Sequence, residues 1–233
     1  MAARNTVIIG AGIAGLSCGR RLSDEGVEFT LVSEDIGGRI HPSRDGAQNL
    51  GAYYVMDDYQ HVQRYVKRGR ALNMLGSRVH IGDRSYTPRN WRSLACLPQS
   101  LRFRRLLKLG PMKAPVRAHM FHVEGTLGPA FARETIHLFG QTDSMLAISR
   151  HENGSILLCS RDEEPCFERF FEQHRVLDHH HWDPAFNLEG DMLLECEQGE
   201  NLYLIGDGNV CGLEDSFITG LYAANRILGR ADG

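Results

Sequence analysis

The stretch that decides the fold lies near the N-terminus, where residues 6–15 read TVIIGAGIAG. Its β-branched start, Thr6–Ile9, is typical of a buried parallel strand. The glycine pattern GxGxxG follows at once, and each glycine has its own task. Gly10 allows a tight turn, Gly12 lets a pyrophosphate approach the backbone, and Gly15 lets the next helix pack closely. We therefore expect a strand–turn–helix unit that binds a dinucleotide.

The residues after this turn extend the pattern. A helix expected over residues 13–25 would point its free N–H groups and its positive dipole end at the phosphates. A second strand, over residues 28–33, leads to Glu34, which stands 19 positions after Gly15, close to the ~20-residue spacing of an acid that binds ribose hydroxyls. This acid would repel a ribose that carries an extra phosphate, so the pattern leaves FAD or NAD, with a purely structural glycine turn as the alternative. The predicted contacts here are Gly10, Gly12, Ile13, Ala14, Gly15, Ser33 and Glu34.

Two further stretches favour FAD. Residues 34–39 read EDIGGR and residues 49–54 read NLGAYY. Both resemble the flavin-containing amine oxidase and phytoene desaturase-like superfamily of FAD-dependent oxidoreductases, in which a Gly-Gly-Arg turn lies along the FAD pyrophosphate and a later backbone segment passes near the flavin ring. Arg39 suits this role, because a planar guanidinium can bind a phosphate through two hydrogen bonds; alternatively it is a solvated turn residue. The resemblance implies cofactor contacts at Gly37, Gly38, Arg39, Leu50, Gly51 and Ala52.

The C-terminal part is similar to the closing motif of the same superfamily. A strand is expected over residues 201–205, followed by Gly206-Asp207 and a helix over residues 214–225. The resemblance implies that Asp207 binds ribose or ribityl hydroxyls, while the N-terminus of the helix stabilises negative charge on a reduced flavin. Asp215 or Ser216 could instead cap the helix. The implied contacts are Gly206, Asp207, Glu214, Asp215, Ser216 and Ile218.

A signature divided between the two ends of the chain predicts a discontinuous domain. We expect an α/β fold in which residues 1–77 and 190–233 form a Rossmann-like, glutathione reductase-type FAD-binding domain. Residues 78–189 would form a small inserted α+β lobe that covers the substrate. Members of the superfamily are longer, so the 233-residue chain is expected to be an unusually short member with a reduced lobe.

The middle of the chain carries two strong turn signals. Gly82-Asp83 and Asn153-Gly154 each lie between β-prone runs and predict hairpins. Helices are expected over residues 57–68 and 91–109, and a short one near 167–174. No second GxGxxG occurs in the sequence, so we expect no separate NAD(P)H domain.

No acid or base can be assigned a catalytic role from the sequence. Trp182 is the one candidate, because it aligns loosely with an aromatic residue that lies near the flavin in related oxidases. It follows three histidines, His179–His181, of which the first and third would share a face of an extended segment. No carboxylate or cysteine completes a recognisable set of ligands, so no metal is expected.

Composition and charge limit the other possibilities. A hydrophobic content of 42%, a charged content of 24% and six cysteines without paired spacing predict a soluble cytoplasmic protein with reduced thiols. The net charge of −3 hides a basic segment, residues 61–117, with 14 Lys or Arg and one acid. This segment could bind a membrane surface or an anionic partner, but we favour its packing against the acidic remainder. No module for nucleic-acid binding is recognisable.

The favoured function is a flavoprotein oxidoreductase of the amine oxidase-like superfamily, which transfers a hydride from a small substrate to N5 of FAD. The alternative is a non-catalytic or electron-transferring FAD-binding subunit of a larger or homo-oligomeric assembly. A small lobe could leave the flavin ring exposed, so that a second subunit covers it or a redox partner protein docks there.

Overall fold

The computed structural model describes residues 5–52, 55, 59–65, 77–87, 115–140, 143–187, 196–207, 209–210 and 212–230. The chain divides into two compact units. The first, called the nucleotide-binding unit below, comprises residues 1–41, 52–72 and 191–233, and the second unit comprises residues 42–51 and 73–190. Residues 42–51, which the sequence assigned to the FAD-binding part, therefore pack with the second unit.

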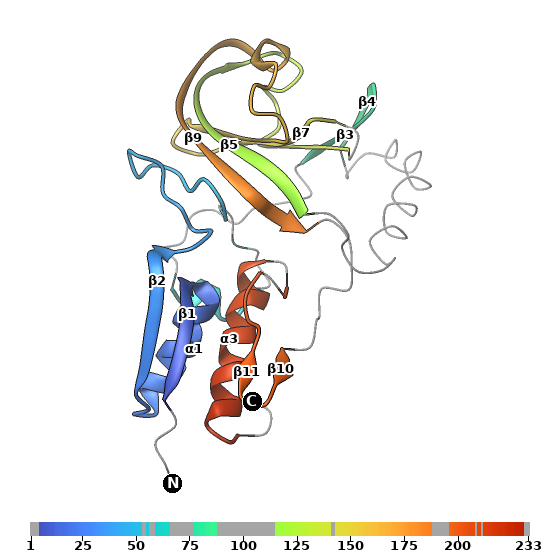
Figure 1. The fold of residues 1–233 in the computed structure, drawn as a ribbon. Helices are drawn as coiled ribbons and strands as arrows, with labels where there is room; N and C mark the ends of the chain where they lie inside the picture. Colours follow the sequence, from blue (N-terminus) through green and yellow to red (C-terminus); the bar gives the residue numbers. More distant parts are fainter. Residues whose placement is uncertain are drawn as a thin grey trace. The chain divides into compact units, whose positions relative to one another are not determined.

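The nucleotide-binding unit starts with the predicted strand–turn–helix (Figure 1). Strand β1 (Thr6–Gly12) leads directly into helix α1 (Ile13–Asp24), and strand β2 (Phe29–Gly37) returns parallel to β1. This parallel pairing confirms the Rossmann-like α/β class. Strand β2 continues three residues past Glu34, because a register shift in β1 restores pairing between Ala11 and Ile36.

The two described helices of this unit, α1 and α3, pack tightly against each other and against one side of the strands. Helix α3 (Leu213–Ile227) approaches α1 so closely that a Cβ on Gly220 would lie 2.1 Å from the carbonyl oxygen of Ala14. The Ser17 hydroxyl donates to the carbonyl oxygen of Phe217 at 2.8 Å. The buried core between helices and strands consists of Ile8, Cys18, Leu22, Ala223 and Ala224, with Val27, Phe29, Tyr203 and Ile205 among the side chains packed on it.

The C-terminal strand is shorter than the sequence predicted. Strand β11 (Leu202–Tyr203) pairs antiparallel with β10 (Glu197–Gly199) in a two-stranded sheet. The N–H of Leu204 then donates to the carbonyl oxygen of Cys196 at 2.8 Å, outside the regular ladder. Both elements still lead the chain to Gly206 and Asp207.

The second unit is built on a seven-stranded sheet with the order β4-β3-β6-β7-β8-β5-β9 (Figure 1). All its pairs are antiparallel except β3 with β6. The strands are β3 (Arg78–Ile81), β4 (Arg84–Tyr86), β5 (Pro115–Leu127), β6 (Ile136–Phe139), β7 (Met145–Arg150), β8 (Ile156–Ser160) and β9 (Phe171–Asn187). Its core consists of Phe121, Val123, Leu127, Met145, Ile148, Ile156, Leu158, Phe170 and Phe171.

Both predicted hairpins are confirmed. Strands β3 and β4 turn at Gly82-Asp83, and β7 and β8 flank Asn153-Gly154. The short helix expected near 167–174 is mostly wrong. Only η4 (Phe167–Arg169) is helical, and Phe171 already pairs with Leu127 of β5, because burial of the phenylalanine in the sheet core outweighs local helical preference.

The remaining helix predictions have different outcomes. Of the helix expected over 57–68, the described residues 59–65 contain only the turn η1 (Val62–Arg64), and the Glu214 carboxylate accepts backbone N–H groups at its start. The helix expected over 91–109 lies outside the described residues. Among the residues that the structure describes, no helix has the length and apolar composition needed to cross a membrane.

Candidate nucleotide-binding site

Helix α1 begins directly at the end of strand β1. Among the described residues, no side chain caps this N-terminus and no acid stands in the first turn of α1. The helix lies tight against the glycine turn, since a Cβ on Gly15 would be 1.9 Å from the carbonyl oxygen of Gly10. An anion placed here would meet free N–H groups and the positive end of the helix dipole.

The Gly-Gly-Arg turn lies directly against this first turn. A Cβ on Gly38 would be 3.1 Å from the Cα of Gly12, so a side chain there would crowd the backbone that the phosphates must approach. The two segments are also joined by Ser33, whose Oγ accepts the N–H of Ala11 at 3.0 Å and donates to the carbonyl oxygen of Asp35 at 2.6 Å. The result is a glycine-lined backbone cradle that fits a pyrophosphate.

Arg39 and Asp207 join the two ends of the chain at this cradle. The Arg39 guanidinium donates through Nε to Oδ2 of the Asp207 carboxylate. Their side chains are 32% and 47% exposed, so a bound ligand could reach both. The two motifs, which lie near opposite ends of the sequence, therefore meet in the structure. The N–H of Ala52 donates to the carbonyl oxygen of Arg39 at 2.7 Å, which joins Ala52 to the same turn.

The N-terminus of helix α3 completes the predicted set. Gly206, at the end of the β11 segment, donates its N–H to Thr219 Oγ1 in α3 at 2.8 Å. The N-cap of α3 is Gly212, and no described side chain caps it, so the expectation that Asp215 or Ser216 caps this helix is wrong. Asp215 and Ile218 are exposed, whereas Ser216 is buried.

Glu214 has a structural role that the sequence did not reveal. Its buried carboxylate accepts three backbone N–H groups, from Gln60 and His61 at 2.8 Å and from Val62 at 3.0 Å. Burial alone would raise the pKa of this carboxyl, but the three N–H donors outweigh it and hold the pKa below its ordinary value. The side chain thus anchors the η1 segment to α3, and its predicted cofactor contact stays a prediction. The one signal in the sequence was an acid in the first turn of a helix.

The other predicted residues belong to the second unit. Leu50 is buried, and its carbonyl oxygen accepts the indole N–H of Trp182 at 2.6 Å. The flavin-ring block Leu50-Gly51 and the catalytic candidate Trp182 are therefore neighbours, although 132 positions separate the bonded pair in the sequence. Arg44 fastens the same segment to β9, since its N–H donates to Asp178 Oδ2 at 2.8 Å.

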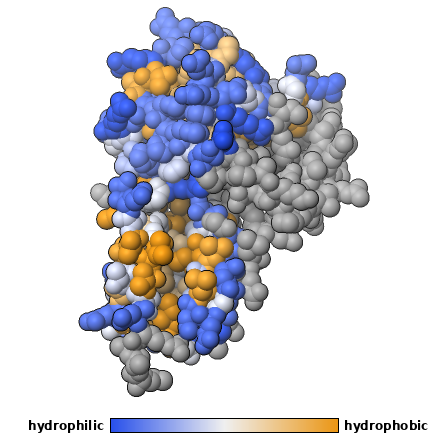
Figure 2. Space-filling model, viewed as in Figure 1, coloured by the Kyte–Doolittle hydropathy of each residue, from blue (hydrophilic) through white to orange (hydrophobic). Residues whose placement is uncertain are grey.

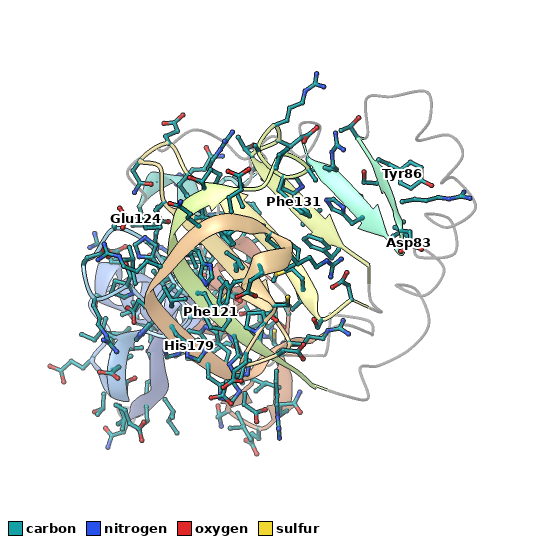
Figure 3. The ribbon with its side chains drawn as sticks, turned by 90° about the horizontal axis from the view of Figure 1, so that it is seen from above. Asp83, Tyr86, Phe121, Glu124, Phe131 and His179 are labelled. Atoms are coloured by element: carbon teal, nitrogen blue, oxygen red, sulfur yellow. The ribbon has the colours of Figure 1, made fainter. Side chains whose placement is uncertain are left out.

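The histidine run lies on β9, with its first and third members on one face as predicted. His119 of β5, which the sequence analysis missed, joins them: its Nδ1 lies 3.0 Å from Nε2 of His179, and its ring stacks on His181 at a centroid distance of 4.4 Å. Figure 3 shows His179 beside Phe121, and their ring centroids are 4.4 Å apart. Only the pairing of β5 with β9 reveals His119 as a neighbour.

The electrostatics of the stack favour the neutral form of His119 and of His179. Desolvation is the largest cause that lowers the pKa of both His119 and His179, and the neighbouring His181 lowers it further. In the described part of the chain, no group of three or more His, Cys, Asp or Glu side chains is placed to hold a metal ion. The three rings stack across the paired strands β5 and β9.

Comparisons with known proteins agree with the geometry of the cradle. Residues 8–69 match the family model of an NAD(P)-binding Rossmann-like domain. A segment of 54 residues, 21% of this chain, is 46% identical to polyamine oxidase 7 of Oryza sativa subsp. japonica. The match covers only 11% of the length of that protein.

A solved structure shares the fold over the whole chain. The crystal structure of a reduced UDP-galactopyranose mutase aligns with a TM-score of 0.62, at 12% identity, over 98% of this chain and 96% of that one. The matched region indicates a dinucleotide-binding Rossmann-like domain, and the 12%-identical structure supports the fold alone. Together with the paired motifs at the two ends, they fit a chain of the flavin amine oxidase-like superfamily of FAD-dependent oxidoreductases.

Proposed function

We propose that the chain binds FAD and is an oxidoreductase that takes a hydride from a small-molecule substrate. The observation that carries this proposal is the contact between Arg39 and Asp207, which unites the two motifs at one glycine-lined cradle. When bound, the flavin supplies a two-electron acceptor at its N5 position.

Each part of the cradle has a defined task in this proposal. The N–H groups at the start of α1 and the Arg39 guanidinium bind the pyrophosphate. Glu34, which is exposed on β2, binds the hydroxyls of the adenosine ribose, and Asp207 binds those of the ribityl chain. The N-terminus of α3 stabilises negative charge at the pyrimidine edge of the flavin.

The second unit holds the candidate for substrate contact. Leu50 and Trp182 form a part-buried backbone–indole contact, and such a fixed aromatic surface can orient an apolar part of a substrate. We assign this pair to positioning and to the exclusion of water. A basic group for proton removal is not required where hydride transfer and positioning suffice.

The first test is the visible spectrum of the purified protein and the identity of the nucleotide that it releases on denaturation. We expect a yellow protein that releases FAD in stoichiometric amount. A colourless protein that fails to take up added FAD would overturn the proposal, and release of NAD would move the site to nicotinamide chemistry.

The variant Arg39→Lys sharpens this test. Lysine keeps the charge but loses the planar two-bond contact to a phosphate, so FAD affinity should fall on the order of tenfold. Arg230→Lys is the matched control, because Arg230 also makes a two-bond ion pair, with Glu25, in the same unit. Equal FAD affinities in the two variants would remove Arg39 from the binding site.

The second candidate function is a non-catalytic or electron-transferring FAD subunit that meets a redox partner protein. One contact favours it: Trp182 commits the single N–H of its indole to Leu50, which leaves that ring no donor for a polar substrate. Anaerobic mixing with small amines separates the two functions. Bleaching of the flavin absorption by an amine supports the oxidoreductase, whereas bleaching by dithionite alone supports the electron carrier.

A further inference from the structure

One face of the strand layer in the nucleotide-binding unit is apolar and open to solvent. Successive residues of β1 alternate between its two sides. Ile8 points into the helical core and is only 5% exposed, whereas Val7 and Ile9 point away from the helices and are 58% and 85% exposed. Figure 2 shows hydrophobic residues gathered on one face of this unit.

The neighbouring segments continue the same face. Val32 of β2 is in register with Ile9 and is 52% exposed. On the other segment, Tyr203 and Ile205 pack on the helical core, so the alternating Leu202 and Leu204 point to the opposite side, where they are 62% and 39% exposed. We call these five side chains the apolar strand face: Val7, Ile9, Val32, Leu202 and Leu204.

The exposed apolar area of this face is comparable to the apolar part of a protein–protein interface. Parallel strands are normally buried on both sides, but the described helices α1 and α3 pack on one side only. The five side chains leave on the order of 500 Å² of apolar surface to solvent, near the upper end of about 300–600 Å² for the largest patch on a monomer. With a polar rim, this approaches the ~800 Å² that each partner of a stable dimer buries.

Three exposed acids border the face among the described residues. Glu28 precedes β2, Glu34 lies within β2 two residues after Val32, and Glu200 precedes β11. The five side chains of the face itself carry no charge. An uncharged apolar centre is typical of homodimer interfaces, which are more apolar than other protein surfaces.

We propose that a second copy of this chain covers the apolar strand face, with the same face of each copy packed across a two-fold axis. A closed two-fold contact buries both faces at once, whereas contact with a different surface would leave one face open. The acids that border the faces of the two copies repel each other, so salt should strengthen the dimer by screening them. This proposal concerns the strands alone and does not require the proposed FAD chemistry.

Sedimentation equilibrium of the purified full chain tests the proposal. We expect a dimer whose dissociation constant rises roughly tenfold or more in Ile9→Lys and in Leu202→Lys, because each variant places a charge in the apolar centre. The matched controls are Ile81→Lys and Val176→Lys, which replace aliphatic side chains of similar exposure, 37% and 40%, in the second unit. Both controls should leave the dimer unchanged.

Several outcomes would overturn the proposal. The first is a wild-type chain that stays monomeric at micromolar concentrations, and the second is a dimer that the two face variants do not weaken. The third is a dimer that dissociates when salt is added, because this would indicate that the acids bordering the face pair with a basic surface. Circular dichroism verifies folding, and if the lysine variants do not fold, Ile9→Thr and Leu202→Thr take their place with the same expected weakening. FAD content is measured separately, so loss of the dimer with FAD retained, or the reverse, distinguishes this proposal from the proposed function.

Discussion

The nucleotide-binding unit and the second unit differ in what determines their geometry. In the first, backbone segments approach one another at glycines, as Gly15 and Gly38 show, and the candidate site is made largely of main-chain groups. In the second, seven strands bury a core of large side chains, and β5 pairs with β9 from Leu127↔Phe171 to Pro115↔Asn187. A short motif can therefore specify a site made of main-chain groups. A sheet held together by a core of large side chains depends instead on residues far apart in the sequence.

The largest effect is expected from a cavity in the second unit. Leu158 is fully buried in its core, and Leu158→Ala should lower the free energy of unfolding by about 3 kcal/mol. Chemical denaturation followed by circular dichroism measures this change. Ile36→Ala, at an exposed aliphatic position of the first unit outside the apolar strand face, is the control and should cost less than about 0.5 kcal/mol. An equal loss of unfolding free energy in both variants would contradict the view that buried side chains stabilise the second unit.

The corresponding change in the nucleotide-binding unit is Gly15→Ala. The new Cβ would lie 1.9 Å from the carbonyl oxygen of Gly10, so α1 must shift away from the phosphate turn. We expect a loss of about 2 kcal/mol in unfolding free energy, together with loss of bound nucleotide, measured by absorption after gel filtration. Gly199→Ala, whose Cβ would meet no atom within 4 Å, should change neither quantity. Normal nucleotide binding by Gly15→Ala would show that the backbone geometry of the turn is not decisive.

The smallest expected effect concerns the anchor between α3 and η1. Glu214→Gln replaces a carboxylate that accepts three N–H groups, and it should cost about 1–2 kcal/mol at neutral pH. Because the pKa of Glu214 is lowered in the folded chain, its stabilisation is present above the ordinary value of 4.5 and is lost as pH falls below it. The difference between wild type and Glu214→Gln should therefore shrink below pH 4.5. A difference that stays constant on acidification would contradict this role.

The same contrast explains which parts of the structure the sequence predicted. The β1–α1–β2 unit and the hairpin at Asn153-Gly154 were predictable, because glycines and turn residues a few positions apart determine them. The meeting of Arg39 with Asp207 was predictable only through the family resemblance. Strand β5 was missed, because its 13 residues carry no turn signal and gain their strand conformation from partners distant in the sequence.

The candidate site shows the same limit at single residues. The phosphate cradle followed from its glycines, but the anchoring role of Glu214 depends on backbone donors more than 150 positions away. The hydrogen bond from Trp182 to Leu50 likewise joins two segments that no local pattern relates. Side-chain roles that arise from tertiary packing leave no periodic trace in the sequence.

The division of the chain has a consequence for how it can be cut. The backbone passes from one unit to the other four times, between residues 41 and 42, 51 and 52, 72 and 73, and 190 and 191. No single cleavage can release either unit whole. Residues 42–190 contain all of the second unit, whereas any uninterrupted fragment that spans the whole nucleotide-binding unit must also contain the second unit. The second unit can therefore be expressed without most of its neighbour, but the nucleotide-binding unit cannot be expressed as one uninterrupted fragment of its own.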